Sequence, residues 1–259
     1  MSWGTTNNES VSPSLSVVII ALNEEHTIGR LLDQISSQTF QPTQLIVSDS
    51  KSTDATETIC KQHPVRWSTL HFHQCNVTKW PAYGRNRGAE LATGEWIVFF
   101  DADTQLPDNL FIQQSMDYLL AHHAQFGYCT LRPSTTDRKS KAGIALTNRF
   151  IRTHAWRRPI VPGGCIFVQR DVHQAIGGFD ETIYLGEDSL YGRTAKKIGA
   201  TLAVLPQPFV FDMRRIHQQW PWTMARRYLK GYRLMYQRNV RFHQWSKKVT
   251  YDFGTYTKK

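Results

Sequence analysis

Apolar and polar positions follow one another along the chain in blocks that fit strands and helices by turns. Residues 15–21 form a β-branched apolar run, which predicts a buried strand. Apolar residues then recur at helical spacing between positions 28 and 35. Asn23 precedes this stretch, so we expect it to cap the helix, with Glu24 and Glu25 in the first turn.

This alternation continues to residue 205. Further strands are predicted at 44–47, 96–100, 126–131, 165–169 and 200–205, and further helices at 82–92, 108–123, 142–154 and 189–198. Ser52-Thr53-Asp54 can start another helix, and Asp108 can cap the helix that follows it. Strands alternating with helices predict an α/β fold with a mostly parallel central sheet flanked by helices. Such a sheet binds its ligand beyond the carboxyl ends of the strands.

A chain of 259 residues, 41% of them hydrophobic, is long enough for one large domain or for a domain with an appendage. We expect residues 1–13 to be a disordered N-terminus and residues 14–213 to form the main domain. Residues 214–259 are expected to be a basic, aromatic, helical C-terminal extension packed on that domain.

The formal net charge of +10 is concentrated in two segments. Residues 214–259 hold twelve Lys or Arg and one acid, and residues 132–161 hold eight against one. Basic patches attract phosphates, anionic lipid or nucleic acid. The stretch 220–245 suits a membrane surface, a helix packed on the core, or a dimer contact. Segment 132–161 suits either a mobile acceptor loop or a second membrane contact.

Cysteine spacing and hydropathy indicate the compartment. Cys60, Cys75, Cys129 and Cys165 have neither metal-ligand nor CxxC spacing, which predicts buried free thiols in a reducing compartment. The first residues lack a basic start followed by an apolar run, and no apolar run is long enough to span a bilayer. We expect a cytoplasmic protein, with a peripheral position on the cytoplasmic membrane face as the alternative.

Two carboxylates, Asp101 and Asp103, follow directly after the apolar run at 96–100. The alternation of a strand points both to the same side. Acids so close repel each other unless a cation or a proton lies between them. Oxygen ligands suit Mg2+ or Mn2+, which commonly bridge carboxylates to a diphosphate. The alternative is a pair of loop acids that cap the next helix.

These acids belong to an ordered set of short motifs, which reads VVIIALNEE, VSDSKSTDAT, RNRGAELATGEW, FFDADT, GGFDE and GED. In this order the motifs resemble those of a family 2 glycosyltransferase with the Rossmann-like GT-A fold, over about residues 15–200. The resemblance implies an inverting transferase that uses a nucleotide-diphosphate sugar, usually UDP-linked, with Mn2+ or Mg2+. Its acceptor would be a glycan, a lipid-linked molecule or a small molecule, in the synthesis of cell-surface glycan or glycolipid.

The resemblance also implies a role for each matched residue. Asp49 would bind the nucleobase, while Ala21, Asn23 and Glu24 would line the nucleotide pocket. Arg85 would touch the nucleotide side of the site. Asp101 would reach the ribose or the metal and Asp103 would ligate the metal, with Ala102 between them. Asp188 would be the general base and Glu187 its neighbour, although Asp188 can also act as an N-cap of the helix at 189–198.

The roles of two glycines, a histidine and an arginine remain open. Gly163 and Gly164 suit close approach of backbone to a ligand, or an ordinary turn after Pro162. His217 would be a third metal ligand, or part of an exposed polar loop. Arg215 beside it can pair with the diphosphate.

Two departures from the family pattern limit which site residues and which reaction type the resemblance implies. The family usually has Asp-Asp-Gly-Ser where this chain has Asp49-Ser50-Lys51-Ser52, so only Asp49 carries over. The Gln-x-x-Arg-Trp pattern of processive polysaccharide synthases is absent from the sequence, which disfavours a processive polymerase.

Other functional classes fit less well. A sugar nucleotidyltransferase would carry a Gly-rich basic phosphate loop after the first strand, where this chain reads ALNEEHTIG. A dinucleotide dehydrogenase would need GxGxxG at that place. The remaining alternative is a nucleic-acid or anionic-membrane binding protein that uses the basic C-terminus. That alternative leaves the acids unexplained, so we expect no nucleic-acid partner.

Overall fold

The computed structural model describes residues 12–64, 70–76 and 81–212. In chain order the elements are β1 (Leu15–Ala21), α1 (Ile28–Ser36), β2 (Gln44–Asp49), α2 (Thr56–Gln62), β3 (Leu70–Gln74), α3 (Pro81–Glu90), β4 (Trp96–Asp101), α4 (Phe111–Ala121), β5 (Phe126–Tyr128), β6 (Leu131–Pro133), α5 (Arg138–His154), β7 (Cys165–Gln169), α6 (Arg170–Ile176), α7 (Glu187–Lys197), β8 (Leu202–Val204) and β9 (Phe209–Phe211).

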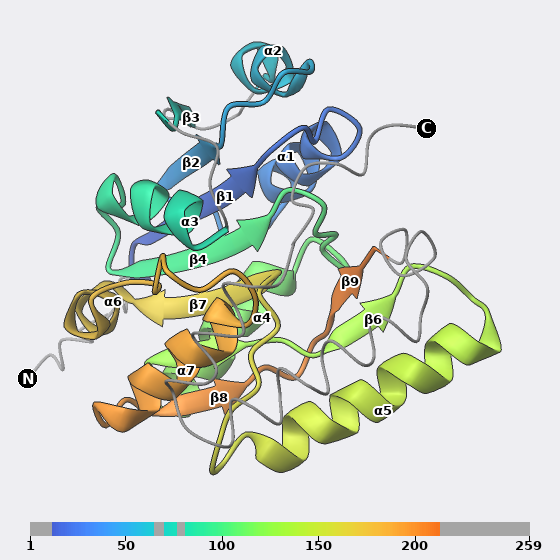
Figure 1. Cartoon of the computed structure of the whole chain (residues 1–259), viewed down its shortest axis with the longest axis vertical. Coiled ribbons are helices and arrows are strands. Elements are labelled where there is room, and N and C mark those ends of the chain that lie inside the picture. Colours follow the sequence, from blue (N-terminus) through green and yellow to red (C-terminus); the bar gives the residue numbers. More distant parts are fainter. Residues whose placement is uncertain (1–11, 65–69, 77–80, 213–259) are drawn as a thin grey trace, which may run out of the picture.

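A seven-stranded sheet forms the centre of the molecule, in the order β3-β2-β1-β4-β7-β5-β8 (Figure 1). Strands β3, β2, β1 and β4 are parallel, whereas β7 runs antiparallel to both β4 and β5. The chain passes from β1 to β2 on one side and returns to β4 on the other. The ends of β1 and β4 therefore form the switch point where α/β sheets bind ligands.

Apolar side chains cover both faces of this sheet, as the continuous hydrophobic runs of β1 and β4 require. One core joins alternate residues of β1, β2 and β4 to α1 and α4. The second joins the intervening residues to α3, α6 and α7. The mostly parallel sheet flanked by helices confirms the predicted fold class. The four cysteines are buried and free, as their spacing predicts.

Beside the main sheet lies a two-stranded sheet of β6 and β9, and α5 packs along its outer side (Figure 1). A backbone bridge between Gln105 and Val210 ties β9 to the loop after β4. The small sheet therefore connects α5 to the end of β4, where the acidic motif lies.

Two expected helix caps are wrong. Asn23 has a left-handed φ of 54°, and its side-chain oxygen accepts from the amide of Thr53 instead of capping α1. Helix α1 begins only at Ile28, after Thr27. Asp108 accepts from the amide of Leu110 in a turn before α4, which begins at Phe111. In both cases the acceptor serves a loop rather than the first helical turn.

The expected strand at 126–131 is also wrong in its extent, because the chain there splits into β5 and β6 in two different sheets. Helix α5 begins at Arg138, four residues before the predicted start, and α7 begins at Glu187, two residues before. Strands β3 and β9 and helix α6 were not predicted; β3 is half-exposed and carries polar residues, so it lacks an apolar run.

Candidate active site

Three predicted site residues lie at the carboxyl ends of neighbouring strands. Ala21 ends β1, Asp49 ends β2 and Asp101 ends β4. Ala21 pairs with Asp49, and Ile20 pairs with Asp101, so register brings the three to one edge of the sheet. The topology thus brings to the switch point three residues that lie up to 80 positions apart in the sequence.

Asp49 organises the loop that follows β2. Its side chain is fully buried, and both carboxylate oxygens bind Ser52, through the backbone amide and the hydroxyl. Ser52 in turn accepts from the amide of Asn23, which joins this loop to the one after β1. Lys51 has a φ of 65°, the left-handed region that glycine favours. This is the position at which the family usually has Gly. Contact of Asp49 with a nucleobase stays a prediction.

Glu24 lies beside these two loops. Its amide donates to the Thr56 hydroxyl, and its carboxylate accepts from the hydroxyl of Thr27 at 2.7 Å. Its carboxylate thus holds the loop after β1 against Thr27, which directly precedes α1. A contact of Glu24 with the nucleotide stays a prediction.

The guanidinium of Arg85 joins the two acidic motifs. Its Nη2 donates to Oδ1 of Asp101 at 2.8 Å, and its Nη1 donates to Oε1 of Glu187 at 2.8 Å. The Arg85 side chain is only 2% exposed and lies over the ring of Phe179. Desolvation by burial lowers the pKa of Arg85, but the neighbouring carboxylates outweigh that effect and raise it. Arg85 is therefore a permanent charge that holds the end of β4 against the start of α7.

Gly163 allows this contact. Nη2 of Arg85 also donates to the Gly163 carbonyl at 3.2 Å. A Cβ at position 163 would lie 2.8 Å from Nη2 of Arg85 and 2.9 Å from Oδ2 of Asp188. A larger residue would push both groups away, so the glycine lets the backbone approach the charged cluster closely. Gly164 next to it packs on Phe209, and its carbonyl accepts from the Thr104 hydroxyl.

Asp188 lies in the first turn of α7, after the left-handed Gly186. It therefore does not cap a helix that starts at 189, and Gly186 takes the N-cap position. Burial raises the pKa of Asp188 to about 8, helped by the negative charge of Glu187, while Arg85 opposes the rise. Burial also raises the pKa of Glu187. A carboxyl with a raised pKa, close to Arg85 and to the acidic motif, is chemically suited to accept a proton near neutral pH.

The acids after β4 were predicted as the metal site. Asp103 is half-buried, and its backbone carbonyl faces Arg30 at 3.5 Å. A divalent ion here would share Asp101 with Arg85, and would take Asp103 as a second oxygen ligand. Among the described residues no group of three or more His, Cys, Asp or Glu side chains gathers as a metal site. Two carboxylates fit a hard cation whose other ligands come from a diphosphate and water.

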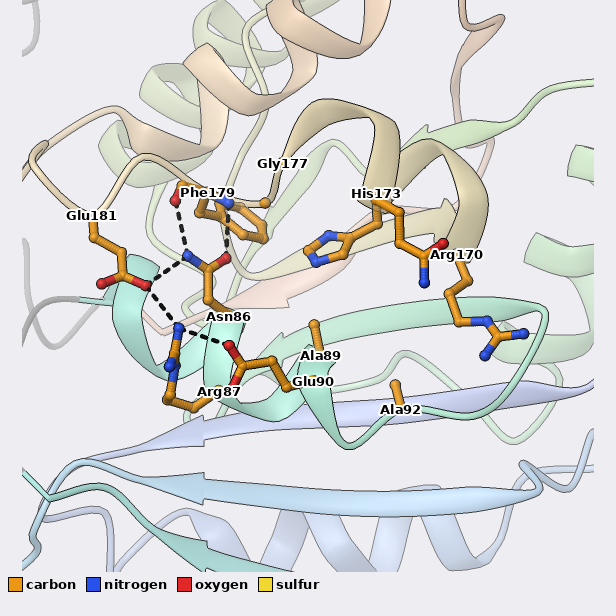
Figure 2. A pocket seen from close by; sticks show the side chains of 12 residues that line it. Asn86, Arg87, Ala89, Glu90, Ala92, Arg170, His173, Gly177, Phe179 and Glu181 are labelled. Atoms are coloured by element: carbon orange, nitrogen blue, oxygen red, sulfur yellow. Dashed lines mark hydrogen bonds and ion pairs between the residues drawn. The ribbon is translucent and has the colours of Figure 1, made fainter.

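A residue that the sequence did not single out, Asn86, links α3 to the loop before α7. Its amide group donates to the carbonyl of Phe179 and accepts from the amide of the same residue, and it also binds Glu181 (Figure 2). These contacts border an open groove of about 610 Å³ between α3, α6 and the loop at 177–181. The only sequence signal was its place in the RNRG motif, next to Arg85.

Arg215 and His217 lie outside the described residues, so their expected contacts with diphosphate and metal stay predictions. The basic C-terminal extension lies there too, and with it the alternative of a nucleic-acid or membrane binding protein. No helix in the described part of the chain is both long and apolar enough to cross a membrane.

Comparison with known proteins identifies the family. The sequence profile of Glycosyl transferase family 2 matches residues 16–177, more than half of the chain. The chain belongs to glycosyl transferase family 2. This family 2 chain is 23% identical to Glycosyltransferase AglE of Haloferax volcanii over 221 residues, which are 82% of this chain and 69% of AglE. It is 26% identical to a GalNAc(5)-diNAcBac-PP-undecaprenol beta-1,3-glucosyltransferase of Campylobacter jejuni over 52% of this chain and 44% of that protein.

Solved structures agree on the fold. The mannosyltransferase PcManGT from Pyrobaculum calidifontis, in complex with GDP-Man and Mn2+, matches with a TM-score of 0.65 and 23% identity. TarS of S. aureus in complex with UDP-GlcNAc matches with a TM-score of 0.62 and 19% identity. The matches cover 78% and 77% of this family 2 chain, but only 57% and 58% of those two chains. The likeness therefore establishes the GT-A type of fold, and this chain spans just over half of each of these neighbours.

Proposed function

We propose that this chain is a metal-dependent, inverting glycosyltransferase of the hexosyl or N-acetylhexosaminyl type, which uses a nucleotide-diphosphate sugar as donor. The observation that carries the proposal is the Arg85 bridge. It sets Asp101 of the acidic motif beside Glu187 and Asp188 at the carboxyl edge of the sheet. Donor-side and base-side carboxylates thus lie at one edge of the sheet, as transfer to a nearby hydroxyl requires.

We assign each of the site residues a role in the reaction. Asp49 and the linked loops at 21–24 and 50–53 shape the nucleotide end. Asp101 and Asp103 would hold Mn2+ or Mg2+, which when bound would neutralise charge on the leaving diphosphate. Asp188 accepts the proton of the acceptor hydroxyl as that oxygen attacks the anomeric carbon. Glu187, fixed by Arg85, keeps Asp188 in place, and a single displacement inverts the anomeric centre.

For the donor we favour a UDP-sugar, and for the acceptor a glycan or a lipid-linked molecule. Support comes from the neighbour solved with UDP-GlcNAc and from the relative named for a polyprenol-linked acceptor. The neighbour solved with GDP-Man and Mn2+ supports the metal and offers guanine as the competing base. We assign the reaction to surface glycan or glycolipid synthesis, and the relatives named for amylovoran biosynthesis in Erwinia amylovora and for an undecaprenol-linked acceptor support this assignment.

Thermal unfolding with UDP, GDP and dTDP, each with and without Mn2+, tests the proposal. Ligand at about a hundred times Kd stabilises the native state by roughly 2.7 kcal/mol. For a domain of this size that is a rise in Tm of roughly 5–10 °C. We expect the largest rise with UDP and Mn2+ together, and none in Asp103→Asn. Asp117→Asn, an exposed acid on α4, is the matched control and should behave as wild type. If no nucleotide raises Tm in the unaltered protein, the proposal is wrong.

A further inference from the structure

Two successive residues of α3, Arg85 and Asn86, hold two places on the segment that leads into α7. Arg85 donates to Glu187 at 2.8 Å, in the first turn of that helix. Asn86 pairs with the backbone of Phe179, eight residues earlier in the chain. The first contact joins residues that already have a role in the proposed reaction, whereas the second has none so far.

The side-chain amide of Asn86 is fully engaged by the loop at 178–181. Its Nδ2 donates to the carbonyl of Phe179 at 2.9 Å, and its Oδ1 accepts from the amide of the same residue at 2.8 Å (Figure 2). Nδ2 also donates to Oε1 of Glu181 at 2.9 Å. Both N–H groups and the oxygen thus have partners. Because two of these bonds go to one residue, this Asn86 clasp fixes the orientation of the Phe179 backbone as well as its distance from α3.

Gly178 shows how closely the loop approaches the clasp. Its φ of 79° lies in the left-handed region, and a Cβ there would lie 2.7 Å from Oδ1 of Asn86. A side chain at position 178 would therefore strain the backbone and push the amide away. The glycine permits the contact between α3 and the loop.

The ring of Phe179 covers the guanidinium of Arg85. Its centroid lies 5.3 Å from Cζ of Arg85, and the residue is 3% exposed. The same ring stacks on Tyr191 of α7 at 3.9 Å and meets Phe99 of β4 edge-on at 5.1 Å. A buried ring keeps water from this side of the cation, which strengthens its attraction to the neighbouring carboxylates. The place of Phe179 thus affects both the charged cluster and the packing of α7.

The two ends of the site are fixed by different parts of the fold. Asp101 ends β4, which the neighbouring strands β1 and β7 hold in the sheet. Asp188 lies in the first turn of α7, which directly follows the loop at 177–186. The carbonyl of Gly186 accepts from the amide of Leu190 at 3.1 Å and closes that turn. A shift of the loop would therefore move Asp188 and leave Asp101 in place.

We infer that Asn86 is a positioning residue for the base end of the site, because its clasp on Phe179 fixes the start of α7, and with it Asp188, beside Arg85. The inference rests on the proposed transferase function, and in this role Asn86 acts through the loop rather than on the substrates. Misplacing a reacting group by about 1 Å can lower a rate by roughly 10²-fold. Loss of the clasp should therefore act on kcat rather than on donor affinity.

Asn148 provides a matched control, because its amide makes the same pair of bonds elsewhere. Its Nδ2 donates to the carbonyl of Leu131 at 2.7 Å, and its Oδ1 accepts from the Leu131 amide at 2.9 Å. This pair of bonds joins α5 to β6, outside the charged cluster. Asn86→Ala and Asn148→Ala each remove an amide that holds a distant backbone, so both should lower Tm.

Turnover is measured as hydrolysis of UDP-GlcNAc, UDP-glucose or GDP-mannose with Mn2+, with water in place of the acceptor. On the donor that the unaltered chain hydrolyses fastest, Asn86→Ala should lower kcat by roughly tenfold to hundredfold and leave KM within about threefold. Asn148→Ala should leave both constants within about twofold, because only the start of α7 bears on the chemistry.

A second variant pair covers the case in which Asn86→Ala does not fold. Asn86→Asp keeps the acceptor for the Phe179 amide but places a carboxylate against Glu181, and like charges so close repel each other. Adding Glu181→Gln replaces that repulsion with an amide donor. We expect the double variant to have a higher kcat than Asn86→Asp alone, at a similar KM.

Hydrogen exchange without any ligand tests the positioning independently of turnover. In Asn86→Ala the amide of Leu190, which closes the first turn of α7, should exchange roughly tenfold faster, while the amides of β4 stay unchanged. Asn148→Ala should change neither. If the unaltered chain hydrolyses none of the three donors, this comparison alone decides the inference.

The inference is wrong if Asn86→Ala lowers kcat no more than Asn148→Ala does, or if the exchange of Leu190 stays as it was. A rise in KM at an unaltered kcat would make Asn86 a binding contact, and would equally overturn the positioning role. Failure of the transferase itself is read separately, because then no nucleotide raises the Tm of the unaltered chain. The exchange of Leu190 would still show whether Asn86 fixes the start of α7.

Discussion

At the scale of single residues, Asp188 combines a cost in stability with a chemical use. Its carboxyl is buried beside Glu187, and both effects raise its pKa, while Arg85 and the backbone amide of Ser189 favour its charged form less strongly. The folded state therefore holds this proton more tightly than the unfolded state. The associated stabilisation is present below the ordinary pKa of Asp and is lost as pH rises toward about 8.

Asp188→Asn should separate the two effects. As the proposed general base is removed, kcat should fall by roughly 10²–10⁴, while nucleotide binding with Mn2+ is retained. In the unaltered protein kcat/KM should rise with pH and level off near the pKa of Asp188, and the residual rate of the variant should lack that rise. At pH 8 the variant should also have the higher Tm. An Asn variant with full activity would remove Asp188 from the chemistry.

His173 makes the opposite prediction for stability. Burial lowers its pKa to about 4, and its Nδ1 lies 2.7 Å from the hydroxyl of Tyr191. The folded state excludes the proton, so the stabilisation is present above about pH 6.5 and is lost as pH falls toward 4. Urea unfolding between pH 7 and pH 4 should show a loss of roughly 2–3 kcal/mol from this group, and His173→Gln should lose less. His26→Gln, at a side chain 62% exposed, should follow the unaltered curve.

The acids of the candidate site stand out in the sequence as motifs, whereas the residues that contact them do not. Motif order pointed to Asp49, Asp101 and Asp188 because short acidic signatures follow strands or open helices. The enclosure of Arg85 by carboxylates, and the amide clasp of Asn86 on Phe179, depend on contacts across 93 to 102 positions. No local pattern carries such contacts, which arise only when α3 and α7 pack on the same face.

At the scale of elements, α3 is held close to the sheet by its glycines. A Cβ at Gly88 would lie 2.3 Å from Cγ1 of Val18 in β1. Gly88→Ala should therefore destabilise the protein by about 1–3 kcal/mol, through overpacking that moves α3 and the neighbouring Arg85. Chemical unfolding measures the loss, and a fall in transferase rate should accompany it.

Gly143 in α5 is the matched control, since a Cβ there would meet nothing within 4 Å. Gly143→Ala should stabilise the protein by about 0.5–1 kcal/mol, because alanine loses less backbone entropy in a helix. If both substitutions shift stability in the same direction, close packing of α3 is not the reason for Gly88.

Elements with strong patterns were predicted well, and those set by the rest of the chain were not. The apolar runs of β1 and β4 and the helical spacing of α1 are local signals. Strand β3 reads LHFHQ and has no buried face. It forms because its backbone pairs in parallel with the edge of β2. Helix α1 starts late because the loop before it is bound to Ser52 and Thr53 rather than to its own amides.

At the scale of the whole molecule, the elements differ in how much of each is buried against the rest of the fold. Strands β1, β2 and most of β4 are buried throughout, whereas the residues of α5 that are buried are Ile144 and Ile151, with Asn148 half-buried between them. Hydrogen exchange should therefore find α5 amides opening at a free energy well below that of the central strands, which exchange by global unfolding. Protection of α5 equal to that of β1 would show one cooperative unit instead.

The Arg85 bridge has a consequence for the order in which the protein is made. Strands β1 to β4 and Asp101 leave the ribosome well before Glu187, the second partner of Arg85, is synthesised. At typical translation speeds the delay is on the order of ten seconds. During that time the nascent chain has a cation destined for burial with only half of its counter-charge, and an incompletely paired buried charge is strongly unfavourable. We therefore expect Arg85 to stay hydrated until the segments that carry Gly163, Phe179 and Glu187 cover it, so that the nucleotide end is completed only when the base end has been translated.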